Sequence, residues 1–433
     1  MNSIFKNIKL TRLSFFSVKS LECNFKLSFS NIQLLLVLLF FGAYGYSQNL
    51  QGYINEALAN SPEIKKFELQ HKRVEEKVNE VNTLPNTQFG VGYFISEPET
   101  RTGAQRFKVS AKQMLPAFGI ITARENYVDA LADAVFEEVA VAKRKLIASV
   151  SKSYYNLYAL KAKQVVLDEN INLLNTYEKL ALTSVESGKA SAVDVLRLQM
   201  RQNELVQQKQ VLEQGYLAEQ TAFNKLLNRD KTISVKVVDN LPMPLSDELF
   251  DSKKLTLHPE LLKYDKLYLS VKQSELINQK DRQPMLGFGL DYVAVSKRPN
   301  MNFNDNGKDI IMPMISISIP IFSNKNKSKT QQNKLKQQEI LAEKENRLNV
   351  LEAMLDKAVK NSNSAKISYT TQAKNLKQAR DAETILIKSY QTGTIDFNDV
   401  LDVQALQLKF QINQIEAVKS YYMQTTIINY LTK

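Results

Sequence analysis

Apolar residues recur every three or four positions over most of this 433-residue chain, a spacing that predicts amphipathic helices. From Gly119 to Ser187 the pattern continues unbroken, and it contains four apolar residues spaced seven apart: Leu160, Leu167, Leu174 and Ala181. A helix of this length extends on the order of 100 Å, far more than one globular core requires. Heptad spacing over such a length predicts coiled-coil packing against a second helix.

In two shorter regions the period changes to two, which predicts β-strands. Phe89, Val91 and Tyr93 alternate with glycine and polar residues, and a second alternating run begins at Phe107. Similar paired runs occur at 286–292 and 315–319. Each pair is typical of a β-hairpin with one apolar face and one small or polar face. Both a soluble sheet and a membrane barrel have this alternation, and the large aromatic and aliphatic residues favour the barrel.

The strand regions are part of a long internal repeat. Ser61-Pro62-Glu63 is matched by His258-Pro259-Glu260, and the stretch 188–196 is matched by 393–401. In both of the latter stretches Gly, Asp, Val, Leu and, three residues later, Gln have the same spacing. The predicted organisation begins with a signal peptide at 1–47. A first repeat at 48–228 contains a helix, a β-hairpin at 86–115 and a long helical hairpin at 119–228. A linker at 229–256 with a short strand near Val235 leads to a second repeat at 257–433, which contains a helix, a β-hairpin at 284–321 and a long helical hairpin at 324–431.

The first 47 residues have the order of a secretory signal: basic residues, an apolar run at 34–41, and small residues. An N-terminal membrane anchor is the alternative. Cys23 is the single cysteine and precedes the apolar run, so a cleaved chain has no disulfide and no thiolate metal site. The net charge of +12 does not indicate nucleic-acid binding, because the basic residues are mixed with acidic ones and lack aromatic neighbours.

The two matched stretches are predicted to be sharp turns between long helices. Gly188 and Gly393 stand where a helix ends in a left-handed cap. Asp194 and Asp399 follow at the start of the next helix, where an acid can cap the helix or favour its dipole. Asp402 lies beyond that first turn, so capping explains it less well.

Four membrane strands cannot close a barrel, because an open edge in lipid leaves backbone groups unpaired. Copies of the chain must therefore supply the missing strands. Three copies give a barrel of twelve strands, within the range known for such barrels. The long helices would then form a tube that continues from the barrel.

These features together resemble the TolC family of trimeric outer-membrane efflux channels. The resemblance covers residues 50–430 and depends on the duplicated turn motif and on the repeated order of helix, hairpin and long helix. It implies a mainly α fold with a small β part: a coiled-coil tunnel of long antiparallel helical hairpins in the periplasm, and four transmembrane strands per chain that complete a 12-stranded trimeric barrel. It also implies a homotrimer in outer membrane lipid, a periplasmic adaptor (membrane fusion) protein, and an inner-membrane pump of the RND, ABC or MFS type.

The same resemblance implies a gate at the helical turns. Asp399 and Asp402 match the acidic rings of the constriction. The positions that match contacts holding the closed end together are Asp194, Tyr390, Gly188 and Gly393. Ile395 stands where the best-known members have an arginine, so part of the closing contacts is expected to differ.

The expected function is a passive conduit that exports small toxic compounds or metal cations, without catalytic residues, cofactor or bound metal. His71 and His258 are the only histidines, and both are expected at the surface. A channel for type I protein secretion is an alternative within the same fold. A periplasmic coiled-coil scaffold is an alternative of another class, and it explains the heptads but not the strands.

Overall fold

The computed structural model describes residues 48–189, 191–244, 252–321 and 324–433. The predicted signal peptide at 1–47 and Ala190 of the first turn motif lie outside the described residues. Residues Asn49–Lys433 form one unit by their contacts. Among the described residues, no helix combines the length and the apolar character that crossing a membrane requires.

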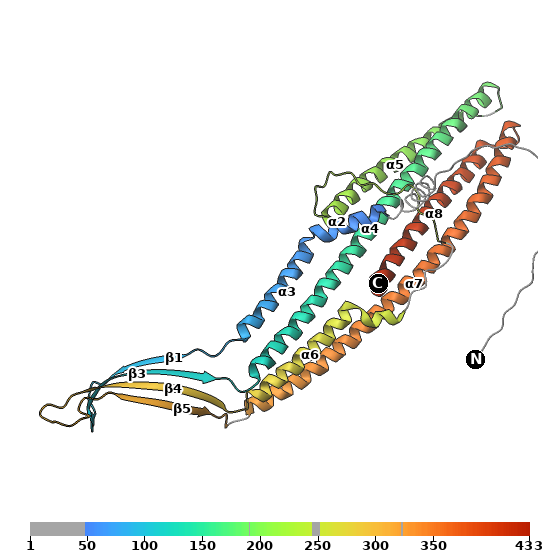
Figure 1. Cartoon of the computed structure of the whole chain (residues 1–433). Coiled ribbons are helices and arrows are strands. Elements are labelled where there is room, and N and C mark those ends of the chain that lie inside the picture. The colour runs from blue at the N-terminus through green and yellow to red at the C-terminus, as the bar shows by residue number, and fades with distance from the viewer. Residues whose placement is uncertain (1–47, 190, 245–251, 322–323) are drawn as a thin grey trace, which may run out of the picture. The chain divides into compact units, whose positions relative to one another are not determined.

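The order helix, strands, long helix, shorter helix occurs twice in this unit (Figure 1). The elements are α2 (Gln48–Asn60), α3 (Pro62–Val81), β1 (Gln88–Tyr93), β2 (Glu99–Thr100), β3 (Gly103–Leu115), α4 (Ile120–Glu186), α5 (Ala192–Leu226), the 3-10 helix η1 (Ser252–Leu257), α6 (Pro259–Lys280), β4 (Met285–Ser296), β5 (Ile310–Ser318), α7 (Asn324–Gln391) and α8 (Phe397–Thr432). The predicted long helices and strand pairs are therefore present, whereas β2 was not predicted. The exact repeat boundaries stay a prediction.

The shorter helices α3 and α6 begin at the matched Ser61-Pro62 and His258-Pro259 positions of the repeat. The Ser61 hydroxyl accepts a hydrogen bond from the Ile64 amide at 3.3 Å. The His258 ring nitrogen Nδ1 accepts one from the Glu260 amide at 3.3 Å. In both helices a proline occupies the first helical position, where its missing N–H costs no intrahelical bond.

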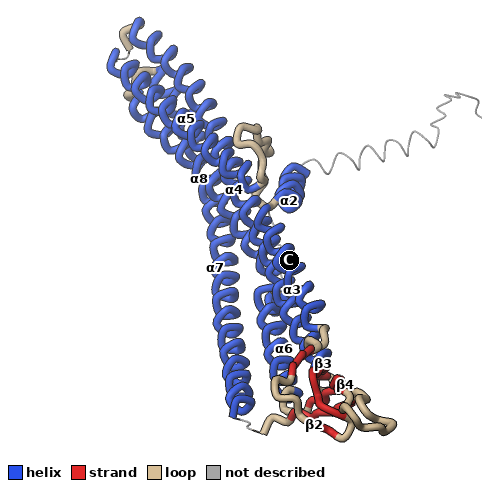
Figure 2. Tube along the Cα trace, turned by 90° about the vertical axis from the view of Figure 1, so that its left-hand side faces the viewer, coloured by secondary structure: helices blue, strands red, loops and turns tan. Residues whose placement is uncertain are grey.

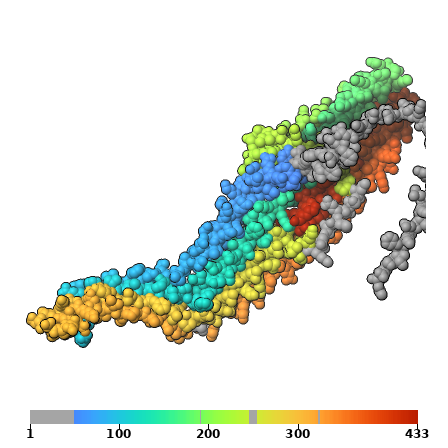
Figure 3. Space-filling model, in the orientation of Figure 1, coloured from blue at the N-terminus to red at the C-terminus, as the bar shows by residue number. Residues whose placement is uncertain are grey.

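The strands and the helices joined to them follow one spatial order. The antiparallel sheet has the order β1-β3-β4-β5, with β2 attached to β3. The helices that lead into or out of these strands are in contact in the matching order α3, α4, α6, α7, and Figure 3 shows them side by side. Figure 2 shows the strands at one end of the helices. The chain thus forms a wall one element thick, in which each strand continues a helix.

Towards the turns, the helices pair as two antiparallel hairpins, α4 with α5 and α7 with α8, and α4 contacts α8 between them. The heptad residues Leu167, Leu174 and Ala181 are buried in a core shared with Leu198 and Leu205 of α5. The coiled-coil packing predicted from the heptads is therefore present.

The strand predicted near Val235 was wrong, because residues 231–241 have no strand partner and take their hydrogen bonds from helix side chains. The Tyr216 hydroxyl donates to the Val235 carbonyl at 2.9 Å, and the Val238 amide donates to the Tyr154 hydroxyl at 3.1 Å. Asn224 donates to the carbonyls of residues 231 and 233. The segment therefore packs on the helices as an extended strap.

His258 was predicted at the surface, and this was wrong as well. Its side chain is fully buried, and its ring packs against Tyr430 with the centroids 5.1 Å apart. Its Nε2 lies 3.2 Å from the Tyr430 carbonyl oxygen. Burial lowers the pKa of His258 to about 4, and the positive charge of Arg144 adds to this against the opposing charge of Glu260.

This buried histidine is expected to make the stability of the protein fall in mild acid. Above the ordinary pKa of 6.5 the ring is neutral in both states and contributes nothing. As the pH falls from about 6.5 to about 4, the unfolded chain binds a proton that the folded chain does not, so the free energy of unfolding decreases. The measurement is the free energy of unfolding across this range.

The matched variant is His258→Asn, which keeps a side-chain acceptor at the helix start but does not titrate. We expect a smaller loss of stability between pH 6.5 and 4 in this variant. Equal slopes for both proteins would show that His258 is not the titrating group.

Candidate functional site

The two predicted turns have the same backbone conformation. Gly188 and Gly393 have φ of 72° and 73°, in the left-handed region. The amide of Gly188 donates to the Val185 carbonyl at 2.9 Å, and the amide of Gly393 donates to the Tyr390 carbonyl, also at 2.9 Å. In each turn the next amide donates to the carbonyl five residues earlier. The left-handed cap predicted at both glycines is therefore confirmed.

Gly393→Ala is expected to lower the free energy of unfolding by about 1–2 kcal/mol, the cost of a left-handed conformation for an L-residue. A Cβ at this position would meet no atom within 4 Å, so the cost comes from the backbone alone. Gly52→Ala, in the interior of α2, likewise meets nothing but has no positive φ. That control is expected to gain about 0.5–1 kcal/mol in chemical denaturation.

The two turns lie at the same end of the hairpins (Figure 1), and residues beside both turns share one buried apolar core. Phe397, at the start of α8, is fully buried between two tyrosines. Its ring centroid lies 4.7 Å from that of Tyr390 and 5.7 Å from that of Tyr177 on α4. Phe397 therefore helps to join the second turn to the first hairpin, and only its apolar side chain could have indicated this role from the sequence.

Tyr390 and Asp194 come together between the hairpins. Asp194 is only 6% exposed, and its carboxylate lies 4.0 Å from the Arg197 guanidinium. Tyr390 is also buried, and within the described ranges its hydroxyl has no well-aligned hydrogen-bond partner. Burial raises the pKa of Tyr390, and the charge of Asp194 adds to this, whereas the Ser184 hydroxyl opposes it. Both groups are therefore polar and buried between the hairpins.

Asp399 and Asp402 have the opposite environment, because both are exposed on α8. Neither makes a hydrogen bond or an ion pair with the part of the chain that the structure describes. The helix start has Asp396 as its N-cap residue, but no side-chain hydrogen bond caps it. The capping arrangement weighed for Asp399 is thus absent in this chain, and both carboxylates point into solvent one helical turn apart.

The four long strands have two chemically different faces. Phe89, Val91 and Ile315 are 77%, 80% and 75% exposed, and they share one face with Tyr292 and Phe288 through the strand register. This apolar face continues across all four strands with nothing covering it within the described residues. A water-exposed sheet would not leave so large an aromatic and aliphatic surface uncovered.

The opposite face is more polar, although methionines of β3 and β5 also lie on it. It contains Ser110, Lys112 and Ser316 together with glycines of β1 and β4. Asp291 lies on this face with no exposed surface and forms an ion pair with Lys108 of the neighbouring strand. One apolar and one polar face is the pattern of a barrel with lipid outside and water inside.

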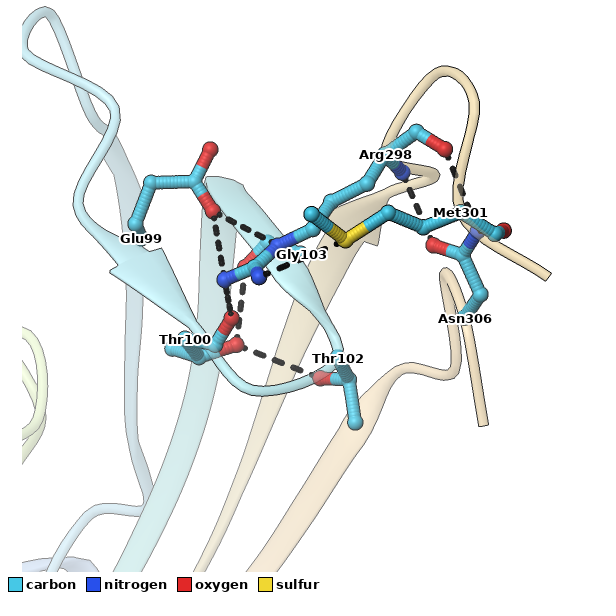
Figure 4. A network of polar contacts seen from close by, with 7 residues as sticks. All are labelled: Glu99, Thr100, Thr102, Gly103, Arg298, Met301 and Asn306. Atoms are coloured by element: carbon cyan, nitrogen blue, oxygen red, sulfur yellow. Dashed lines mark hydrogen bonds and ion pairs between the residues drawn. The ribbon is translucent and has the colours of Figure 1, made fainter. Parts of the chain in front are cut away.

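The two hairpin loops at the far end of the sheet are bonded to each other (Figure 4). Arg298 donates to the Glu99 carboxylate at 3.1 Å and to the Thr100 carbonyl, and its own amide donates to Asn306 at 2.8 Å. Arg101 pairs with Asp305 at 2.7 Å. The loops of the two repeats therefore form one cross-bonded cluster.

Among the described residues, no three His, Cys, Asp or Glu side chains gather in a way that could hold a metal ion. The site of interest is instead an arrangement of surfaces: two faces of a sheet, and two turns with exposed carboxylates.

Comparison with known proteins agrees with this architecture. Residues 53–229 match the family model for outer membrane efflux protein. No curated protein sequence matches the chain significantly.

Three solved structures have the same fold. The outer-membrane channel OprN is 16% identical, with a TM-score of 0.72 and 89% of each chain covered. The outer membrane protein VceC from Vibrio cholerae is 15% identical, with a TM-score of 0.69, covering 90% of this chain and 97% of that one. The MtrE outer membrane channel of Neisseria gonorrhoeae is 16% identical, with a TM-score of 0.69, covering 89% and 88%. Residues 53–229 thus match the model of the outer membrane efflux protein family, and the chain as a whole has the fold of these solved outer membrane proteins.

Proposed function

We propose that this protein is the outer membrane channel of a tripartite efflux pump. Three copies form a passive conduit that leads small toxic compounds or metal cations from the periplasm to the exterior. The sheet lies in the outer membrane and the helices extend into the periplasm. No residue of the described chain is assigned a catalytic role, so the energy for transport comes from the pump.

The observation that carries this proposal is the wall with two unpaired edges. Among the described residues, β1 pairs only with β3, and β5 pairs only with β4. These edges border the exposed apolar face, where lipid would leave their backbone groups unsatisfied. Pairing β5 of one copy with β1 of the next removes both edges and closes a ring. Three copies give a barrel of twelve strands.

The gate is assigned to the helical turns. Asp399 and Asp402 of three copies would place six carboxylates near the axis, where acidic rings favour cations. Asp194 and Tyr390, with Gly188 and Gly393 shaping the turns, hold the second hairpin against the first. The burial of Asp194 and Tyr390 between the hairpins supports this assignment, because contacts there must change if the hairpins separate.

The partners follow from the proposed role. A conduit that spans only the outer membrane needs a periplasmic adaptor protein and an inner-membrane pump to deliver its cargo. The turns are the end at which they would meet it. The fold shared with the outer membrane channels MtrE and OprN supports a channel rather than a free-standing scaffold.

The proposal is tested by measuring the mass of the detergent-purified protein and its conductance in planar lipid bilayers. We expect a trimer that is recovered from the outer membrane fraction and that conducts ions. Crosslinking before extraction, followed by mass spectrometry, would identify the adaptor and the pump. A monomer that remains soluble without detergent would contradict the proposal.

A further inference from the structure

A cluster of buried carboxamides lies between the two helical hairpins, on the part of α8 that directly follows Asp399 and Asp402. Asn170 on α4 and Gln404 on α8 are 5% and 0% exposed. The Gln404 Nε2 donates to the Asn170 Oδ1 at 2.8 Å. The Asn170 Nδ2 in turn donates to Gln411 at 3.0 Å and to the carbonyl of Val166 at 2.7 Å. The cluster thus links α8 of the second hairpin to α4 of the first.

This polar contact differs from the contacts inside each hairpin. Within the first hairpin, buried leucines of α4 and α5 pack together, and such contacts resist any change of spacing. On the side of α4 that faces the second hairpin, polar side chains instead recur every seven residues. Lys163 is hydrogen-bonded to Glu416, Asn170 to Gln404, and Tyr177 to Glu383. The seam between the hairpins is therefore mixed: apolar contacts such as Phe397 with Tyr177 cross it, and these buried polar pairs lie among them.

The seam is incompletely satisfied at its most buried point. The Gln404 Oε1 has no hydrogen-bond partner within the described part of the chain, although the residue is fully buried. A buried carbonyl without a partner is unfavourable, so the arrangement seen is not the best that this side chain can make. Moving α8 away from α4 would therefore not break a hydrogen bond at this oxygen.

The duplicated motif provides a comparison within the same chain. Gln199 is the glutamine of the first motif, at the position that corresponds to Gln404. It is exposed and donates to Glu178 at 2.8 Å, within its own hairpin. Only the second copy of the motif places its glutamine between the hairpins, so the motif itself does not require the buried contact.

We propose that Gln404, Asn170 and Gln411 form a positioning cluster that sets how readily the second hairpin moves away from the first, and so how often the turns open. This inference rests on the proposed function as a gated channel. The cluster does not touch the transported compound. It acts through the spacing of α4 and α8, and this spacing in turn affects the contact between Asp194 and Tyr390 at the turn.

The proposal predicts opposite effects for two variants at the same site. Gln404→Ala leaves Asn170 without its donor, so the closed arrangement is weakened and the open-to-closed ratio should rise about tenfold. Asn170→Leu with Gln404→Leu replaces both partners by apolar groups, which removes the unpaired carbonyl and packs the seam like a hairpin interior. The double variant should open less often than the unaltered protein. Single-channel recording in planar bilayers measures both ratios.

Gln199→Ala is the matched control, because it deletes the corresponding exposed glutamine and is expected to leave gating unchanged. A Gln404→Ala channel that behaves like Gln199→Ala would overturn the inference. So would a double variant that opens as often as Gln404→Ala, since a merely structural role would shift both in the same direction. If the unaltered protein forms no channel at all, the proposed function itself fails, and that result is distinct from either of these.

Discussion

Replacing Asp399 and Asp402 together by asparagine is expected to remove most of the channel's preference for cations. The two side chains are exposed, are one turn apart on α8, and have no partner among the described residues. Their charge is therefore not neutralised within the chain, and in the proposed trimer six of them would surround one axis. Asparagine keeps the size and removes the charge, so the change isolates electrostatics from packing.

The effect of the double variant on block by multivalent cations is expected to be large, because such a cation is attracted by all six carboxylates of the proposed ring at once. Block by a trivalent cation added on the side of the turns should weaken by at least about tenfold, while the channel remains open to ions. The reversal potential in a salt gradient should move towards zero. Both quantities come from the same bilayer recordings.

Asp381→Asn is the control for the loss of a negative charge outside the proposed ring, because Asp381 is an exposed carboxylate on α7 away from the turn. It should leave selectivity and block unchanged. If the double variant at 399 and 402 retains both properties, the carboxylates do not line the constriction, and the ring assignment is wrong even if the protein is a channel.

The sequence predicted the parts of this fold that depend on local spacing. The heptad leucines of α4 identified its buried stripe, because the helical period alone decides which residues share a face. Gly188 and Gly393 marked the turns, because a left-handed cap favours glycine whatever surrounds it. Alternation located the long strands and separated their two faces in the same way.

The sequence did not predict features that depend on residues far apart in the chain. The run near Val235 has strand-like alternation, but tyrosine and asparagine side chains of distant helices bind its backbone first. His258 is polar and follows a loop, yet Tyr430, 172 residues later, covers it. Phe397 and the carboxamides around Gln404 were missed for the same reason, because α4 supplies their partners.

The sequence also left the environment of each candidate carboxylate open. Asp194 and Asp399 occupy corresponding positions, and spacing alone gave both the same capping interpretation. The structure separates them: Asp194 faces the buried seam beside Tyr390, whereas Asp399 faces solvent. Only tertiary contacts decide this difference, because Tyr390 of the second hairpin lies near Asp194, whereas Asp399 has no partner among the described residues.

Ile315→Arg is expected to prevent assembly in the outer membrane. Ile315 lies on β5, is 75% exposed, and belongs to the apolar face that the proposal places against lipid. An arginine on the lipid face of a barrel costs about 2–4 kcal/mol at mid-depth, and three copies would bear it at once. The yield of trimer in the outer membrane fraction should fall by more than about tenfold, because each 1.4 kcal/mol is a factor of ten.

Ser316→Arg is the matched control, because the adjacent residue on the same strand points to the polar face. Its cross-strand partner is Gly287, whereas that of Ile315 is Phe288. In the proposed barrel this arginine would project into the water-filled interior, so assembly should persist and only the conductance should change. If both variants assembled equally well, the apolar face would not contact lipid, and the sheet would have to be covered by protein instead. If both failed, the strand would tolerate no arginine on either face, and the two-faced barrel wall would lose its main support.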